Sequence, residues 1–204
     1  MNIIFDIGNV LVKWDPVEIV RSVITTAGAV RVAEHLFAHQ DWHEIDRGAL
    51  TIPEIIQRAV ERTDIDEDIV AAIYHAVPAS LTPIPESILL LEQLKRAGHG
   101  IYALSNMGHD NAAYLAETAS FWREFDAKVI SAEVKLIKPD PAIYEYLLNQ
   151  NGLTNFDCIF IDDSLVNVKT AESLGIKSIH FHSAAQARDE LRSYISWPEQ
   201  QGVN

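Results

Sequence analysis

Six polar residues of the sequence end or follow short apolar segments that lie far apart in the chain. They are Asp6, Ser105, Asn106, Lys138, Asp162 and Asp163. A carboxylate can serve as a nucleophile or bind a cation, and hydroxyl and backbone N–H groups can donate hydrogen bonds to phosphate oxygens. An ammonium group can neutralise charge on a transferring group. These residue types predict transfer chemistry on an anionic substrate if the fold brings them together.

Three carboxylates at one place repel one another unless a cation lies between them. If Asp6, Asp162 and Asp163 meet without a partner, at least one pKa rises or the fold is destabilised. Mg²⁺ removes this conflict, because it prefers one or two carboxylates together with water and a substrate phosphate. We therefore predict a Mg²⁺ site in which Asp163 binds directly and Asp162 acts through water.

Each of these residues also has a purely structural interpretation. Asp6 can cap a turn at a strand end, and Asp162 and Asp163 can cap the helix that follows them. Lys138 taken alone is typical of a solvated surface lysine, although its place at a predicted helix start favours a role in the site. Asn167, one helical turn after Asp163, can donate a supporting hydrogen bond.

Short β-rich segments that alternate with helical patterns must position these residues. The run from Cys158 to Ile161 is apolar on both faces, which is typical of parallel strands covered by helices on both sides. The fold class is therefore α/β with a doubly wound parallel sheet, and the carboxyl ends of its strands form one crevice. The predicted strands span 2–6, 100–105, 127–131, 158–162 and 177–180, and the clearest helices between them span 86–97, 139–149 and 164–174.

The interval 14–85 interrupts this alternation and contains only helical patterns. Apolar residues recur at helical spacing from Ile52 and again from Ile69, which predicts two amphipathic helices that share a small core. Pro78 and the two prolines after it mark the return to the sheet, because such a cluster disfavours a continuous helix. We expect the polar end, residues 199–204, to be frayed.

The four polar motifs, in this order, resemble those of the haloacid dehalogenase superfamily of hydrolases. The resemblance covers essentially the whole chain and implies a Rossmann-like core, residues 1–14 and 86–204, with an inserted helical cap, residues 15–85. It implies a Mg²⁺-dependent phosphatase acting on a small phosphorylated metabolite, with an aspartyl-phosphate intermediate on Asp6 and with Lys138 offsetting charge. The implied substrate-binding residues are Ser105 and Asn106, and the implied metal ligands are Asp6, Gly8 through its carbonyl, Asp162 and Asp163.

Gly8 is a departure from the pattern of many phosphatases of that superfamily, which carry a second aspartate there as general acid. A general acid contributes ~10²- to 10⁴-fold to the rate, so its absence suits a good leaving group. The segments 5–10, 104–106 and 162–167 look most like a bacterial subgroup containing sugar-phosphate phosphatases, including α-glucose-1-phosphate phosphatase. A sugar 1-phosphate has a hemiacetal leaving group, which is more acidic than an ordinary alcohol.

Two further groups of residues have open interpretations. The segment 41–48 of the predicted cap concentrates polar and aromatic residues and can act as a specificity loop in which Arg47 binds substrate. Equally, Trp42 can belong to the cap core and Arg47 can pair with a neighbouring carboxylate. His180 and His182 can share a metal, although the carboxylates already account for one.

The composition excludes several classes of partner. The 16 Lys and Arg against 29 Asp and Glu give a net charge of −13, so nucleic acid and anionic membranes are excluded as partners. Cys158 is the one cysteine, predicted to be a small buried thiol, and the lack of a signal or membrane segment predicts a cytoplasmic protein. The oligomeric state and the identity of the substrate stay open.

Two other functions compete with the phosphatase. A 2-haloacid dehalogenase is favoured by Gly8, since the dehalogenases it resembles also lack the second aspartate, but those enzymes need no metal and generally lack the acidic pair found at Asp162 and Asp163. A noncatalytic phospho-ligand-binding protein is also compatible, because a fold alone does not establish an activity.

Overall fold

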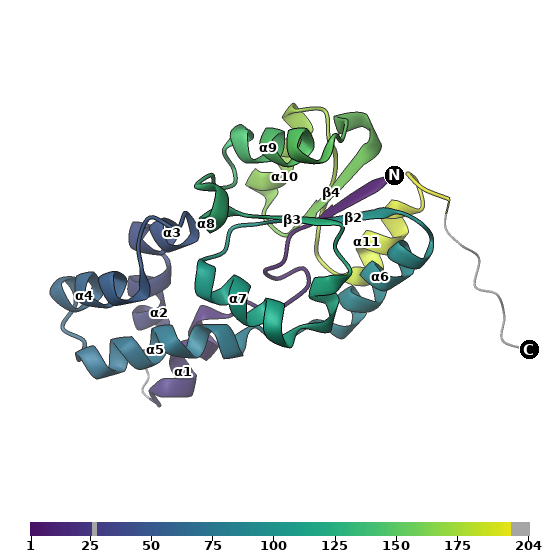
Figure 1. Cartoon of the computed structure of the whole chain (residues 1–204). Coiled ribbons are helices and arrows are strands. Elements are labelled where there is room, and N and C mark those ends of the chain that lie inside the picture. Colours follow the sequence, from purple (N-terminus) through teal and green to yellow (C-terminus); the bar gives the residue numbers. More distant parts are fainter. Residues whose placement is uncertain (26–27, 197–204) are drawn as a thin grey trace, which may run out of the picture.

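The computed structural model describes residues 1–25 and 28–196, so the predicted frayed end 199–204 lies outside the described residues. Its centre is a five-stranded sheet in which all neighbouring strands are parallel, in the order β3-β2-β1-β4-β5 (Figure 1). The doubly wound parallel sheet expected from the sequence is confirmed. The strands are β1 (Asn2–Phe5), β2 (Gly100–Ser105), β3 (Ala127–Ile130), β4 (Cys158–Asp162) and β5 (Lys177–His180).

Helices cover both faces of the sheet, because the side chains of each strand alternate between two apolar clusters. Ile3 and Phe5 pack toward one cluster, and Ile4 packs toward the other. Helices α6 (Pro85–Arg96), α7 (His109–Thr118) and α11 (Ala184–Leu191), with the short 3₁₀ helix Ser120–Arg123, cover the first face, and α9 (Pro141–Asn151) and α10 (Leu165–Ser173) cover the second. A 3₁₀ turn, Asn155–Asp157, precedes β4.

The order of the strands fixes where a ligand site can form. The chain passes from β1 to β2 and β3 on one side and then returns to β4 and β5 on the other. The direction of winding therefore changes beside β1, and a parallel sheet opens a crevice at the carboxyl ends of the strands at such a point. Asp6 follows β1 there, and Asp162 ends β4.

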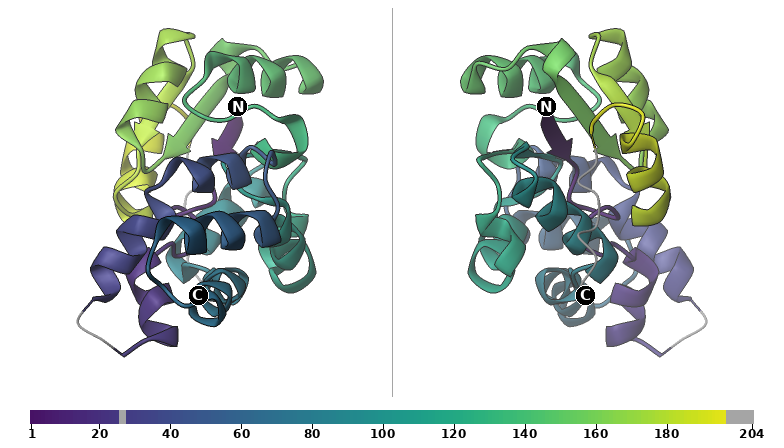
Figure 2. Two further views of the ribbon diagram at one scale, coloured as in Figure 1. Left: turned by 90° about the vertical axis from the view of Figure 1, so that its left-hand side faces the viewer. Right: turned by 90° about the vertical axis from the view of Figure 1, so that its right-hand side faces the viewer.

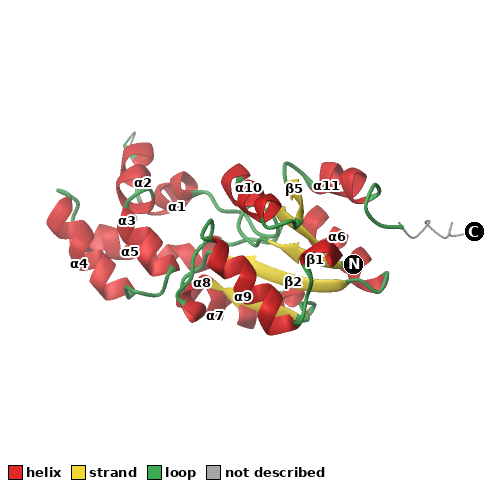
Figure 3. Ribbon diagram, turned by 90° about the horizontal axis from the view of Figure 1, so that it is seen from above, coloured by secondary structure: helices red, strands yellow, loops and turns green. Residues whose placement is uncertain are grey.

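Five helices between β1 and α6 form a group with its own apolar core, seen at one end of the molecule in Figure 3 and facing the viewer in the left panel of Figure 2. Four aromatic rings, those of Trp14, Phe37, Trp42 and Tyr74, stack or meet edge to face within it. We propose that this group is the cap, with the boundaries expected from the sequence. The helices are α1 (Pro16–Val23), α2 (Ala29–Phe37), α3 (Gln40–Asp46), α4 (Ile52–Arg62) and α5 (Glu67–Ser80).

A four-residue helix, α8 (Ser131–Val134), joins this group to the sheet. The Ser131 hydroxyl donates a hydrogen bond to the main-chain carbonyl of Asp46, and Lys135 Nζ lies 2.5 Å from the carbonyl oxygen of Gly48. Gly48 has φ +68°, and an added Cβ would lie 2.5 Å from the carbonyl oxygen of Ala132. The turn after α3 is thus seated closely on α8, and only glycine fits at position 48.

The proline cluster does separate two helices, since α5 ends at Ser80 and α6 begins at Pro85. Helix α5 nevertheless runs through Pro78, because a proline in the last turn removes a single N–H donor while Tyr74 and Val77 remain buried. The prediction for Lys138 is wrong. Lys138 does not open a helix: α8 follows β3 directly, and α9 begins at Pro141 with Asp140 as its N-cap, so Lys138 lies in the intervening loop. Among the described residues, the helices are too short or too polar to cross a membrane.

Candidate active site

Lys138 is the centre of a buried ion triad. Its Nζ lies 2.9 Å from Asp6 Oδ1 and 2.7 Å from Asp162 Oδ2, and only 1% of the lysine side chain is exposed. Burial acts to lower the pKa of Lys138, but the carboxylates of Asp162 and Asp6 outweigh it, and the pKa is raised. The ammonium group is therefore charged at neutral pH, in contact with Asp6.

Asp6 is held at the end of β1 by its own backbone. Its N–H donates to the Ile161 carbonyl of β4 at 2.9 Å, and its Oδ1 accepts from the N–H of Ile7 at 2.7 Å. Burial raises the pKa of Asp6, the positive charge of Lys138 opposes this, and the neighbouring carboxylates reinforce it. A buried carboxylate with one oxygen fixed in this way is arranged to present the other to a substrate.

Asn106 positions the lysine. Its side-chain amide donates to the Lys138 carbonyl at 2.9 Å and accepts from the Lys138 N–H at 2.8 Å, so both ends of the amide are used. The Asn106 side chain thus faces the backbone of Lys138, and the contact predicted with substrate is that of the Asn106 backbone N–H. Ser105 is buried at the end of β2 and lines the same crevice as Asp6.

The acidic pair after β4 is divided between two environments. Asp162 is fully buried and accepts hydrogen bonds from the Lys138 ammonium, the Ser164 N–H and the Asn167 amide. The expected support from Asn167 therefore goes to Asp162. Asp163 lines the crevice and accepts from the Asn9 amide at 3.2 Å. Burial raises the pKa of Asp163, and the hydrogen bond from Asn9 opposes it.

The carboxylates form a set that fits a hard divalent cation. One oxygen from each of Asp6, Asp162 and Asp163 lies within 4.8 Å of the others, and every candidate ligand atom is oxygen. Asp6, Asp163 and Gly8 line the crevice, whereas the oxygens of Asp162 already accept N–H donors. The donor set therefore suits direct ligation by Asp6 and Asp163, with Asp162 behind them.

The crevice over Asp6 has a volume of about 200 Å³ and contains a further carboxylate, from the segment 41–48 in which the sequence singled out Arg47. Asp46, the last residue of α3, is buried and belongs to the lining, whereas Arg47 does not: its Nε lies 3.8 Å from Glu44 Oε1, and its side chain is partly exposed. The residues that line the crevice are Asp6, Gly8, Asn9, Val12, Trp14, Trp42, Asp46, Leu81, Ser105, Asn106, Met107, Asn111 and Asp163.

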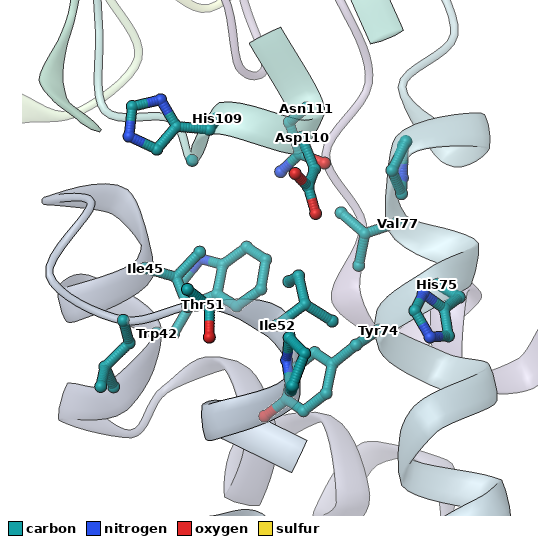
Figure 4. Close-up of a pocket in the computed structure, with 14 residues that line it drawn as sticks. Trp42, Ile45, Thr51, Ile52, Tyr74, His75, Val77, His109, Asp110 and Asn111 are labelled. Carbon is teal, nitrogen blue, oxygen red and sulfur yellow. The ribbon is translucent and has the colours of Figure 1, made fainter. Parts of the chain in front are cut away.

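A second cavity, of about 250 Å³, lies beside the crevice and shares Trp42 and Asn111 with it. Figure 4 shows side chains of α3, α4 and α5, among them Trp42, Ile52 and Val77, facing the start of α7 across this space. Trp42 belongs to the apolar core of the helical group and also lines both cavities, so the two interpretations of that residue are compatible.

Asn9 and the two histidines complete the surroundings. Asn9 adopts φ +52°, a conformation that asparagine tolerates better than most residues, and the Gly8-Asn9 pair is the sequence signal for this turn.

The Nε2 atom of His180 lies 2.9 Å from the main-chain carbonyl oxygen of Asp163, and the ring of His180 contacts that of His182 with centroids 4.3 Å apart. Cys158 is buried, as predicted.

Comparisons with known proteins find relatives that align with most of this chain. A sesquiterpene phosphatase of Aspergillus oryzae is 27% identical over 192 residues, which are 94% of this chain and 95% of that protein. A drimenol cyclase of Aspergillus calidoustus is 28% identical over 204 residues, which are 98% of this chain but only 38% of the cyclase. The chain therefore spans little more than a third of that second relative.

A solved structure shows the same fold. A haloacid dehalogenase family enzyme of Bacteroides thetaiotaomicron, in complex with magnesium and inorganic phosphate, superimposes with a TM-score of 0.70 at 24% identity, covering 87% of this chain and 92% of that one. The family model of the haloacid dehalogenase-like hydrolases matches residues 1–175. Since this match covers most of the chain, including all four polar motifs, the protein belongs to the haloacid dehalogenase-like hydrolase family.

Proposed function

We propose that this protein is a Mg²⁺-dependent phosphatase that hydrolyses the phosphate ester of a small metabolite. The observation that carries the proposal is the Lys138 ammonium between Asp6 and Asp162, beside a crevice that also contains Ser105 and Asp163. A carboxylate in contact with a buried cation, below a space for an anion, is suited to attack phosphorus. The full-length similarity to a sesquiterpene phosphatase supports the same reaction class.

The residues divide the reaction between them. The free oxygen of Asp6 attacks phosphorus in line, the P–O bond to the alcohol breaks, and an aspartyl phosphate forms. Lys138 holds the nucleophile and neutralises charge, while the Ser105 hydroxyl and the Asn106 N–H donate to phosphate oxygens. Water then attacks phosphorus, which releases inorganic phosphate and restores Asp6. Mg²⁺, held by Asp6, Asp163 and the Gly8 carbonyl, would supply electrostatic stabilisation of the phosphoryl oxygens.

Two substrate classes are compatible with this site. A sugar phosphate such as glucose 1-phosphate fits the hemiacetal leaving group discussed above. A phosphate ester of an apolar alcohol is favoured by the second cavity, whose lining includes Trp42, Ile45, Ile52 and Val77. The sesquiterpene phosphatase among the relatives supports the second class.

A phosphate-release assay tests the function and the substrate class together. The panel contains glucose 1-phosphate, other sugar phosphates, nucleotides, phospho-acids and alkyl, prenyl and aryl phosphates, each with Mg²⁺ and with EDTA. We expect Mg²⁺-dependent release that Asp6→Asn lowers by at least about 10³-fold. Circular dichroism and thermal denaturation check that the variant is folded, because asparagine has nearly the same shape as aspartate.

The competing functions give different results in the same experiment. Substantial activity of Asp6→Asn would contradict the assignment of the nucleophile. Halide release from a 2-chloro acid in EDTA would show a dehalogenase instead. Binding of phosphorylated ligands without turnover of any ester would show a binding protein.

A further inference from the structure

The departure of an alcohol from phosphorus needs a proton, and the loop after β1 does not supply one. Gly8 carries no side chain, and an added Cβ there would meet no heavy atom within 4 Å, so no other side chain fills the space beside it. A positioned acid typically contributes ~10²- to 10⁴-fold to such a step. The acid must therefore come from another element if esters of ordinary alcohols are substrates.

Among the described residues that line the crevice, the carboxyl groups are those of Asp6, Asp46 and Asp163. Asp6 is the nucleophile of the proposed function. Asp163 accepts a hydrogen bond from Asn9 and belongs to the acidic set that suits a metal. Asp46 has neither role, and it enters the crevice from the helical group, across from the strand ends.

We propose that the carboxyl group of Asp46 is the general acid for departure of the alcohol and the general base for the water that follows. This inference rests on the proposed function. An in-line displacement places the leaving oxygen on the side of phosphorus opposite Asp6, which is the side that the helical group closes.

The backbone around Asp46 is fixed by contacts with the core. Its main-chain carbonyl accepts a hydrogen bond from the Ser131 hydroxyl, and two residues later the Gly48 carbonyl oxygen lies 2.5 Å from Lys135 Nζ. The carboxyl group of Asp46 is itself buried at the lining of the crevice. Because the backbone on which the carboxyl group stands is fixed to the core, Asp46 keeps a defined place at the crevice, as proton transfer requires.

The surroundings of Asp46 favour its protonated form at the start of the reaction. Burial raises the pKa of Asp46 to about 7, and the negative charge of Asp6 adds to the effect, while the Gly108 N–H and the Lys138 charge oppose it. A phosphate dianion bound beside Asp6 brings further negative charge to this region. Burial of the carboxyl group therefore favours its protonated form, as a general acid requires.

The two steps balance in protons and electrons. When Asp6 attacks, the electron pair of the breaking P–O bond stays on the alcohol oxygen, which takes the proton of Asp46, and the alcohol leaves. Asp46 is then a carboxylate. It accepts a proton from water as the water oxygen bonds to phosphorus, the P–O bond to Asp6 breaks, and Asp46 is again protonated as inorganic phosphate departs. Water is the one co-reactant needed.

The test compares two esters that differ in their need for an acid. Nitrophenolate leaves p-nitrophenyl phosphate as a stable anion, whereas an alkyl phosphate must expel an alkoxide or be protonated. For Asp46→Asn we expect kcat/KM to fall ~10²- to 10⁴-fold with the alkyl ester and to change little with the aryl ester. The ratio kcat/KM reports the steps up to formation of the aspartyl phosphate, so a slow second step does not hide the difference.

Two further variants sharpen the result. Glu44→Gln on the same helix, outside the crevice lining, should leave both esters unaffected. Adding Gly8→Asp to Asp46→Asn should restore part of the alkyl-ester activity, because there is room at position 8 for a side chain. An equal loss with both esters, or full alkyl-ester activity in Asp46→Asn, would overturn the role of Asp46. Failure of the proposed function would show separately, as no phosphate release by the unaltered protein.

Discussion

At the scale of single residues, the charge of Lys138 stabilises the buried carboxylates of the site at neutral pH. It lies between two carboxylates that are themselves withdrawn from water, and desolvation of three charges is costly unless each has a partner. The side-chain amide of Asn106 fixes the main chain of the lysine in the loop after α8. Each charged group of the triad is therefore stable in the protein interior only while the other two are present.

Replacement of Lys138 should therefore destabilise the folded protein. In EDTA, Lys138→Met should lower the free energy of unfolding by about 3–5 kcal/mol at neutral pH, since Asp6 and Asp162 lose their partner. The loss should be smaller at about pH 5 than at about pH 8, because a raised carboxyl pKa means that the folded state prefers the protonated form and loses stability as the pH rises. Urea denaturation measures it.

The matched control for this variant is Lys169→Met, which alters an exposed lysine of α10. It should change stability by less than about 0.5 kcal/mol. If Lys138→Met proved as stable as Lys169→Met at both pH values, the triad would not contribute as its geometry implies.

Apart from Lys138, which lies in a loop, the site residues found by sequence reasoning are those whose position at a strand end identifies them. Asp6, Ser105 and Asp163 follow or end strands, and parallel strands bring their ends together. The segment 41–48 was singled out, but Arg47 was chosen from it instead of Asp46, because which of its side chains enters the crevice depends on how the helical group packs over the sheet. The use of the Asn106 side chain on Lys138 is likewise a long-range contact.

At the scale of elements, the turn after α3 is the joint between the helical group and the core. Gly48→Ala places a methyl group 2.5 Å from the Ala132 carbonyl oxygen and also strains a left-handed backbone. Gly152→Ala is the control, because Gly152 has a similar φ of +61° with no heavy atom within 4 Å of an added Cβ. The control should cost about 1–2 kcal/mol.

We expect Gly48→Ala to cost more than its control in thermal denaturation and to lower phosphate release as well, since displacement of the turn moves Asp46. Gly152→Ala should retain activity. Equal destabilisation by the two variants, with activity unchanged in both, would mean that the turn after α3 adapts to the methyl group and that its close seating on α8 is unimportant.

The strands were predicted nearly to the residue, because buried parallel strands are apolar runs bounded by polar ends. Helices were harder to delimit. The four residues of α8 are too few to show a period, and α5 extends two residues past Pro78 because a proline in a last turn removes only one donor. Short elements and helix ends are decided by tertiary contacts.

At the scale of the whole molecule, the net charge of −13 favours the binding of cations. Binding of a cation at a specific site should raise the stability of the folded protein. Saturating Mg²⁺, at about 100 times its Kd, should add about 2.7 kcal/mol and raise Tm by roughly 5–10 °C. Asp163→Asn should abolish most of this shift, whereas Asp64→Asn, at an exposed position between α4 and α5, should retain it.

Differential scanning fluorimetry with Mg²⁺ and with EDTA measures these shifts without any substrate. An equal response of the two variants would mean that magnesium binds diffusely to an acidic surface and not at the carboxylates beside Asp6. The measurement therefore distinguishes a site from a general effect of charge.

The lining of the crevice has a kinetic consequence. Among the described residues that form it, three are aspartates and none is lysine or arginine, while Lys138 is buried and does not reach the lining. A phosphate dianion that arrives alone meets the carboxylates of Asp6 and Asp163 with no cationic side chain in the lining to offset them. Catalysis is thus expected to follow a compulsory sequence of addition, with the divalent ion first and the ester second, and the magnesium concentration should govern the apparent affinity for the ester before it governs the maximal rate.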